Sequence, residues 1–255
     1  MQMANNLLAA DCLKCSVRGP RSFCGLPAIA LQELQRMGVS QHLGSRAVVL
    51  REGFSAGKVF LVCSGRLKIS VSSSDGRLLI LRIAGPGDAL GLASLLSGSR
   101  YSTTVETLEP CTLKAIPRDD FLRFMEAFSY VRRNTSISVA REYEAALLSA
   151  RRLALSTSAA AKLANALLEL AHMAHPNGTA LAPPTPSPLA STSLPSQPLD
   201  FSLPLTHEEI GCMAGISRET VTRLFSKFRR ERLLRQKGEN VTLIDPNRLD
   251  TLYCV

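Results

Sequence analysis

The spacing of apolar residues divides the chain into a strand-rich part and helix-rich parts. From about residue 46 to 117, short apolar or alternating runs such as residues 78–83 are separated by glycine turns such as Gly-Pro-Gly-Asp at 85–88. Regular short strands with turns at this spacing predict a small antiparallel barrel or jelly roll. From about 118 to 152 no Gly or Pro interrupts the chain. There, apolar or small residues recur every three or four positions, which predicts one long helix.

Residues 206–228 predict two helices joined by a tight turn. Thr206 is placed to cap the first helix, and Glu209, three positions later, completes a capping box. Gly215 supplies the backbone freedom that a sharp turn needs, and Ser217 restarts the chain as the next N-cap. The second helix then has an apolar stripe at spacings of three and four, made of Val221, Leu224, Phe225 and Phe228.

The opposite face of this second helix is polar and carries Arg218, Glu219, Thr222 and Arg223. An Arg side chain matches guanine O6 and N7, and a carboxylate accepts from cytosine N4. Residues 216–237 hold eight Lys or Arg against two Glu, which favours a phosphate backbone. Residues 233–244 predict a two-stranded wing that places Lys237 near phosphate. The pattern indicates a DNA-reading helix-turn-helix; the alternative is a solvated amphipathic helix in an ordinary helical domain.

Length and charge agree with such a protein. The 255 residues suffice for two domains, and the net charge of +9 favours an anionic partner, although charge alone also fits RNA or a membrane surface. No apolar stretch is long enough to span a membrane, and the N-terminus lacks the basic start of a signal peptide. We therefore expect a soluble, cytoplasmic protein without a membrane partner. The four histidines have no catalytic or metal-ligand spacing, so no enzyme is predicted.

The N-terminal arm, residues 1–36, carries three of the seven cysteines, at Cys12, Cys15 and Cys24. Clustered thiols in a reducing compartment bind metal or sense redox state. Basic residues lie among them, at Lys14, Arg18 and Arg21. Their charge is expected to favour thiolates and to offset the negative charge of a metal–thiolate centre.

The sequence Ser-Arg-Glu-Thr-Val-Thr-Arg at 217–223, preceded by Leu-Thr-His-Glu-Glu-Ile at 205–210, resembles the Crp/Fnr superfamily of bacterial transcription regulators. Residues 63–68 and 85–88 are similar to the β-roll of cyclic-nucleotide-binding-type domains. The resemblance implies an α+β protein, with a sensory β-roll over 37–125, a dimerisation helix over 126–153 and a winged helix-turn-helix over 154–255. It also implies a homodimer that binds double-stranded DNA at an inverted TGA…TCA repeat and contacts RNA polymerase.

The long helix has two possible packing partners. Its periodicity fits packing either on its own β-roll or on the same helix of a second copy, and the resemblance favours the second copy, a dimer. The seam would be Phe128, Val131, Thr135, Val139, Tyr143, Ala146, Ala150 and Leu153.

Residues 175–204 hold eight of the 14 prolines. Because this composition does not build a core, a mobile Pro-rich insertion is predicted over 176–200.

The β-roll lacks the residues with which the family binds cyclic nucleotides, and this limits the signals that the protein is expected to sense. The family's cyclic-nucleotide pocket uses a Glu for the ribose and an Arg-Ser pair for the phosphate. Here Leu92 stands at the Glu position, and Tyr-Ser-Thr-Thr at 101–104 replaces the Arg-Ser pair. Cyclic AMP is therefore not expected, and the rival of a cyclic-nucleotide module for an enzyme partner is disfavoured.

Fnr-type members of the superfamily carry three ligands of a [4Fe–4S] cluster before the roll and a fourth within it. Cys12, Cys15 and Cys24 resemble the first three, and Cys111 lies in a segment similar to the one that holds the fourth. Aligning on Ile116 instead puts Lys114 at that position. Cys63 is a rival fourth ligand, although an apolar strand favours a core role for it. Zinc or a thiol–disulfide switch remains an alternative for the three N-terminal cysteines.

Overall fold

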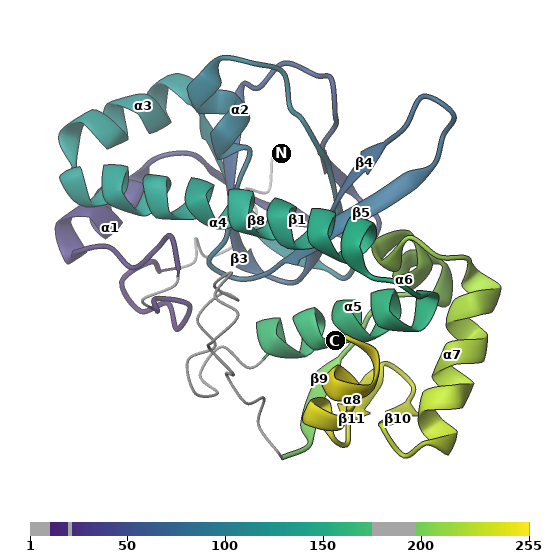
Figure 1. The fold of residues 1–255 in the computed structure, drawn as a ribbon. Helices are drawn as coiled ribbons and strands as arrows, with labels where there is room; N and C mark the ends of the chain where they lie inside the picture. Colours follow the sequence, from purple (N-terminus) through teal and green to yellow (C-terminus); the bar gives the residue numbers. More distant parts are fainter. Residues whose placement is uncertain (1–10, 20–21, 175–196, 255) are drawn as a thin grey trace, which may run out of the picture. The chain divides into compact units, whose positions relative to one another are not determined.

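The computed structural model describes residues 11–19, 22–174 and 197–254. The chain divides into two compact units. The first, Met1–Val71 with Ile83–Tyr143, contains most of the strands. The second, Ser72–Arg82 with Glu144–Val255, contains the C-terminal helices (Figure 1). No helix among the described residues combines the length and apolar character needed to cross a membrane.

The strands of the β-roll form two four-stranded sheets, which confirms the predicted jelly roll. One sheet has the order β1-β8-β3-β6, formed by Val39–Leu43, Cys111–Pro117, Lys58–Ser64 and Ala89–Leu90. The other has the order β2-β7-β4-β5, formed by Val48–Leu50, Thr104–Thr107, Leu67–Ser72 and Leu78–Ala84. Neighbouring strands run antiparallel, as in the pairing of β1 and β3 with β8.

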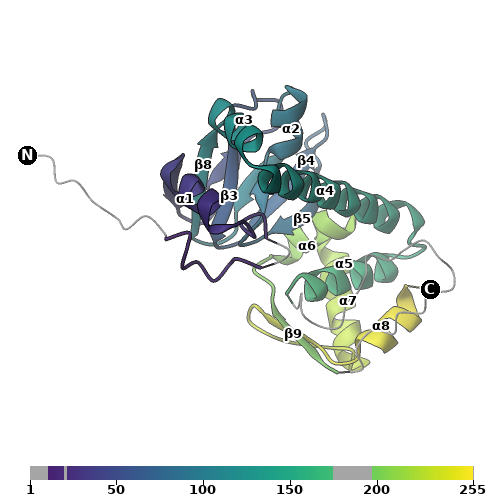
Figure 2. The ribbon, with the colours of Figure 1, turned by 90° about the vertical axis from the view of Figure 1, so that its left-hand side faces the viewer.

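Three short helices cover one face of the first sheet: α1 (Ala28–Arg36), α2 (Leu92–Ser97) and α3 (Arg118–Ala127). Helix α1 lies beside β3 and β8 (Figure 2) and buries Leu31 and Leu34 in the core that these strands share. Phe23, just before α1, is buried in the same core, and its ring centroid lies 5.9 Å from that of Phe121 on α3. Apolar packing thus holds the arm that carries the cysteines against the β-roll.

The prediction of one uninterrupted helix over 118–152 was wrong, because the chain breaks between α3 and α4 (Ser129–Leu155). Phe128 is extended, with φ −130° and ψ 112°, and its ring packs edge-on against Phe124 at 5.4 Å. The Phe128 side chain is half-buried against the core to which α3 and α4 both contribute, and helical periodicity alone does not predict this break.

The two ends of α4 differ in how they are packed. Val131 and Thr135 are buried and Val139 is half-buried, which matches the alternative that the helix packs on its own β-roll. Tyr143 and Leu147, further along, are 65% and 46% exposed. Of the later residues of the predicted seam, Ala146 and Ala150 are exposed as well, whereas Leu153 is half-buried.

The C-terminal unit contains α5 (Ala159–Ala174), α6 (His207–Ala214), α7 (Arg218–Arg230) and α8 (Pro246–Tyr253). Its sheet has the order β10-β11-β9, formed by Leu234–Lys237, Asn240–Leu243 and Leu199–Ser202. The hairpin of β10 and β11 confirms the predicted wing. Strand β9 overturns the C-terminal limit of the predicted insertion, because Leu199 and Asp200 pair with β11. The part of that insertion at 176–196 lies outside the described residues.

Candidate DNA-binding surface and cysteine pocket

The turn between α6 and α7 is fixed by contacts among close sequence neighbours. The Thr206 hydroxyl accepts from the Glu209 backbone N–H at 3.2 Å, and the Glu209 carboxylate accepts from the Thr206 N–H at 3.0 Å. Gly215 adopts the left-handed conformation with φ +66°, and the Ser217 hydroxyl caps α7 by accepting from the Thr220 N–H at 3.3 Å. The predicted caps and turn are all present.

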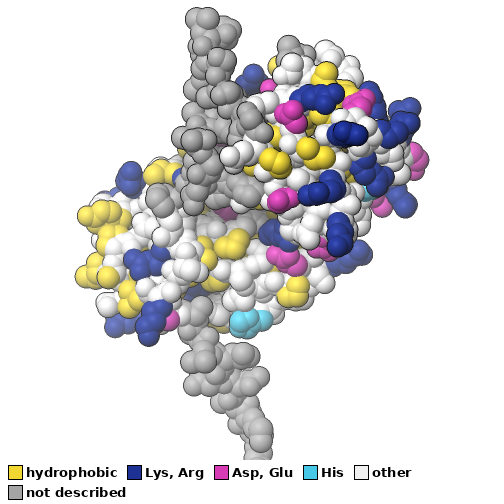
Figure 3. All heavy atoms as spheres, turned by 90° about the horizontal axis from the view of Figure 1, so that it is seen from below, with side chains coloured by type: hydrophobic (Ala, Val, Ile, Leu, Met, Phe, Trp, Pro, Cys, Tyr) yellow, Lys and Arg dark blue, Asp and Glu magenta, His cyan; other side chains and the backbone are white. Residues whose placement is uncertain are grey.

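Helix α7 buries one face and exposes the other. Val221, Phe225 and Phe228 are 0% exposed, and Leu224 is 7% exposed. The side chains expected to read bases are all exposed, as is Lys237 on the wing; on the helix they are Arg218, Glu219, Thr222 and Arg223. Figure 3 shows Lys and Arg side chains gathered on the side of the molecule where Figure 1 places α7.

One of these side chains, Thr222, is engaged within the protein. The Thr222 hydroxyl donates to the Arg218 carbonyl at 3.0 Å and lies 2.9 Å from Nδ1 of His207 on α6. Burial lowers the pKa of His207, and Arg218 and Arg229 add to that effect. His207 therefore links the two helices of the motif. Its ring centroid also lies 5.0 Å from that of Phe225.

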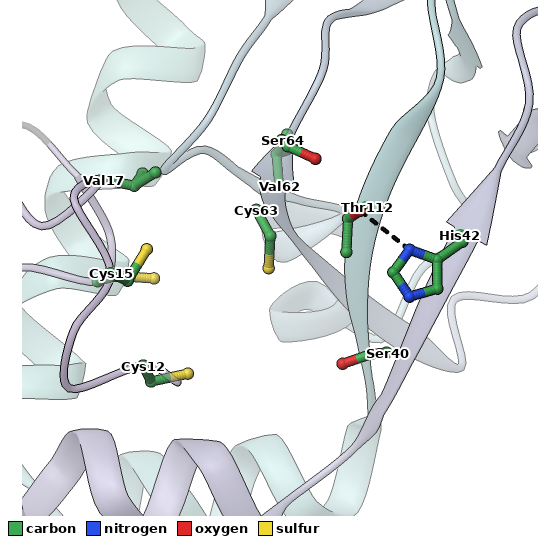
Figure 4. A pocket seen from close by; sticks show the side chains of 10 residues that line it. Cys12, Cys15, Val17, Ser40, His42, Val62, Cys63, Ser64 and Thr112 are labelled. Atoms are coloured by element: carbon green, nitrogen blue, oxygen red, sulfur yellow. Dashed lines mark hydrogen bonds between the residues drawn. The ribbon is translucent and has the colours of Figure 1, made fainter. Parts of the chain in front are cut away.

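A cavity in the β-roll unit brings four cysteines together. Cys12, Cys15 and Cys24 from the arm and Cys63 from β3 line a cavity of about 230 Å³. Figure 4 shows the side chains of Cys12, Cys15 and Cys63 directed toward a common space. The opposite wall is polar and includes Ser40, His42 and Thr112, with His42 Nδ1 3.1 Å from the Thr112 hydroxyl.

The arm reaches this position through contacts on both sides of Cys24. The Phe23 N–H donates to the Gly87 carbonyl at 2.8 Å, and the Asn134 side chain on α4 donates to the Phe23 carbonyl at 2.9 Å. Gly87 has φ +92°, and a Cβ there would lie 2.6 Å from the Ser22 hydroxyl. The close approach of arm and roll therefore requires glycine at position 87.

Cys63 faces the pocket from β3. Leu61, two positions earlier on the same strand, is buried in the core that Cys12 and Cys24 contact, and alternation along the strand places Cys63 on that same face. A β-bulge lies at this point, because Val62 pairs with Leu113 and Ser64 pairs with Thr112. The apolar strand had favoured a core role for this thiol, but it borders the cavity instead.

Cys111, expected as the fourth ligand, lies elsewhere. It is 3% exposed and belongs to the core cluster that contains Leu113 and Val105. Its thiol donates to the Glu109 carbonyl at 3.2 Å. Thr112 lines the pocket, and adjacent residues of a strand point to opposite faces, so Cys111 points away. The structure groups Cys63, and not Cys111, with the three cysteines of the arm.

The electrostatics of the pocket differ from the sequence expectation. Burial raises the pKa of Cys24 to about 12, and the neighbouring Cys63, Cys12 and Cys15 add to the rise. Burial likewise raises the pKa of Cys12 and Cys63. Burial therefore acts against the thiolate form at these three positions, which is opposite to the effect expected from the basic neighbours in the arm.

The basic residues of the arm lie at the surface. The Lys14 side chain is 87% exposed, with Nζ 3.7 Å from Asp11, and Arg18 is exposed and donates to the Leu13 carbonyl. Arg21 lies outside the described residues. In the part of the chain that the structure describes, no three His, Cys, Asp or Glu side chains are already close enough to hold one metal ion.

A β-roll, a long helix and a winged helix-turn-helix define the class of two-domain DNA-binding regulators. The profile of the cyclic nucleotide-binding domain matches residues 40–128, and that of the Crp-like helix-turn-helix domain matches residues 161–252. The chain belongs to the Crp/Fnr superfamily and is a DNA-binding transcription regulator.

Individual proteins agree with this assignment. The transcriptional activatory protein AadR of Rhodopseudomonas palustris is 29% identical over 93% of this chain and 91% of its own. The cAMP-activated global transcriptional regulator CRP of Pasteurella multocida is 24% identical over 78% of this chain and 87% of its own. The solved structure of FixK2 from Bradyrhizobium japonicum has the same fold, with a TM-score of 0.69 at 22% identity, covering 86% of this chain and 98% of that one.

Proposed function

We propose that this regulator senses oxygen or redox state through a [4Fe–4S] cluster held by Cys12, Cys15, Cys24 and Cys63, and binds palindromic DNA as a homodimer. The observation that carries the proposal is the cavity of about 230 Å³ that these four cysteines line from two separate chain segments. Cys63 takes the place of Cys111, the fourth ligand expected from the sequence, because of these two cysteines only Cys63 lines that cavity.

The donor set suits an iron–sulfur cluster. Thiolates are the usual ligands of such clusters, and a bound cluster would supply iron that oxygen attacks. The thiols border a space with room for a group of several atoms. A zinc ion requires each thiolate sulfur to lie about 2.3 Å from the metal. The four cysteines would then have to move together and close this cavity. A zinc site or a thiol–disulfide switch is therefore the less favoured alternative.

The contacts around Cys24 give the pocket a route to the long helix. The Asn134 side chain of α4 donates to the carbonyls of Phe23 and Gly25, which flank Cys24 in sequence. A change in the ligand state of Cys24 alters the position of these carbonyls, and Asn134 passes that displacement to α4. This contact biases α4 between two arrangements in the dimer.

The dimer and the DNA contacts follow from exposed surfaces. Beyond Tyr143, the exposed apolar side chains of α4 include Leu147 and suit a second copy of the helix. Arg218 and Arg223 are exposed on α7 and suit a TGA…TCA inverted repeat, which a dimer reads in successive major grooves. RNA polymerase is a further expected partner, and we place the protein in the cytoplasm.

A cyclic nucleotide is the less favoured effector. Leu92, at the position of the family's ribose-binding Glu, is 0% exposed within the apolar core. The Tyr101 hydroxyl donates to the Lys58 carbonyl at 2.7 Å and accepts from its N–H at 3.1 Å. The Leu92 side chain thus packs in the core, and the Tyr101 hydroxyl is hydrogen-bonded to the backbone.

The test is anaerobic purification followed by a visible spectrum and assays of iron and sulfide. We expect brown protein with about four irons per chain, and tight binding to a TGA…TCA duplex that weakens after exposure to air. Colourless protein that contains zinc under strict anaerobiosis would refute the cluster. DNA binding that does not change between anaerobic and air-exposed protein would refute the sensing role.

A further inference from the structure

Lys114 on β8 is a buried cation for which the described part of the chain provides no carboxylate partner. It is 6% exposed, and its Nζ donates to the Gln35 carbonyl at 3.1 Å. Among the described residues, no Asp or Glu forms an ion pair with it, whereas Lys68, also buried, has Nζ 3.1 Å from Glu106. A buried charge is costly unless an opposite charge balances it. A negative charge from another source is therefore expected beside Lys114.

The cysteine pocket is the neighbour that can supply this charge. Lys114 lies two positions from Thr112 on the same strand, so both side chains face the same side of the sheet, and Thr112 lines the pocket. Across the sheet Lys114 pairs with Ser40, another lining residue. Burial raises the pKa of Cys12 and Cys63, and the Lys114 charge opposes that rise at both thiols.

We propose that Lys114 is the counter-cation of the cysteine pocket, stabilising the anionic metal–thiolate centre formed by Cys12, Cys15, Cys24 and Cys63. Four thiolates around a divalent ion or an iron–sulfur core leave a net negative charge, which matches the unbalanced ammonium. Lys114 acts through the thiolates and not on the metal, so it is a positioning residue. The inference rests on the proposed metal centre, but not on its being iron–sulfur.

The test uses cobalt(II) as probe, titrated anaerobically into metal-free full-length protein and followed by its thiolate charge-transfer absorption. Lys114→Met removes the charge and keeps most of the apolar stem. We expect its cobalt affinity to fall about 10–100-fold, the range for loss of groups that support metal ligands. Lys114→Arg keeps the charge and should restore most of the affinity.

Lys14→Met is the matched control, because it removes the same charge from a side chain between Cys12 and Cys15 that is 87% exposed. Solvent screens that charge, so its affinity should stay within about twofold of wild type. If Lys114→Met does not fold, as judged by circular dichroism, Lys114→Gln is used in its place. This variant removes the charge and keeps a donor for the Gln35 carbonyl.

Each outcome decides the inference. Unchanged cobalt affinity in the neutral Lys114 variants, an equal loss in Lys14→Met, no recovery in Lys114→Arg, or wild-type protein that binds no cobalt would overturn it. Protein that never acquires iron, yet binds cobalt with the expected dependence on Lys114, would refute the proposed cluster and leave the counter-cation intact. The two failures are thus distinguishable.

Discussion

The helix-turn-helix and the cysteine pocket are built in opposite ways. The first lies within residues 206–230, and its caps and turn join residues only a few positions apart. The second takes its walls from the arm and from β1, β3 and β8, so residues up to 100 positions apart share one cavity, as Cys12 and Thr112 do. The reading surface therefore depends on local geometry, whereas the pocket depends on sheet register and on the docking of the arm.

The largest expected effect separates the two candidate fourth ligands of the pocket. Cys63→Ser should lower the iron content from about four per chain to less than about one, because a serine oxygen binds iron–sulfur clusters poorly. Cys111→Ser should keep the cluster, since its thiol bonds to the Glu109 carbonyl in a separate core. Iron and sulfide assays on anaerobic protein measure both. The reverse pattern would return the fourth ligand to Cys111.

The next effect tests the reading surface of α7. Arg223→Ala and Arg218→Ala should each weaken binding to the inverted repeat by about 1–3 kcal/mol and weaken non-specific binding much less. Lys227→Ala is the control on the same helix, because Lys227 Nζ lies 3.8 Å from Glu231 and 5.0 Å from the Tyr253 ring centroid. Gel shifts with specific and scrambled duplexes measure the difference. Full affinity and selectivity in both Arg variants would show that another surface reads the DNA.

A smaller effect tests the link between the pocket and α4. Asn134→Ala removes two hydrogen bonds to the arm, each contributing roughly 0.5–1.5 kcal/mol. We expect the iron content to stay unchanged and the difference in DNA affinity between anaerobic and air-exposed protein to shrink. Ser136→Ala, which removes only a bond to the Arg132 carbonyl within α4, should leave that difference intact. An unaltered response in Asn134→Ala would exclude this route.

The smallest effect concerns the Pro-rich segment. Replacing residues 179–196 with a short Gly/Ser turn, and so keeping β9 whole, should leave DNA affinity within a few-fold of wild type, because such a composition contributes little packing. The melting temperature and a gel shift measure the outcome. A loss of folding would mean that the segment is part of the core.

The errors in the sequence-based interpretation concern how segments pack, which spacing along the chain does not reveal. The break at Phe128 depends on its contact with Phe124 in a core that both α3 and α4 enter. Strand β9 depends on a partner, β11, that lies some 40 positions further along the chain. Lys14 and Arg18 lie beside the cysteines in sequence but at the surface in space. The contact that forms β9 is long-range, whereas the break at Phe128 and the surface position of Lys14 involve contacts between near neighbours in sequence.

The sequence by itself determined the superfamily, the β-roll, the wing, the caps at Thr206 and Ser217, and the division of α7 into a buried and an exposed face. These features depend on residues a few positions apart, because capping hydrogen bonds and helical periodicity join near neighbours in sequence. Only the tertiary structure decided that Cys63 joins the cysteine pocket, that Cys111 leaves it and that Lys114 lies beside it. The reason is that the pairing of β1, β3 and β8 and the docking of the arm set which side chains face the cavity, and neither is visible until the strands are paired.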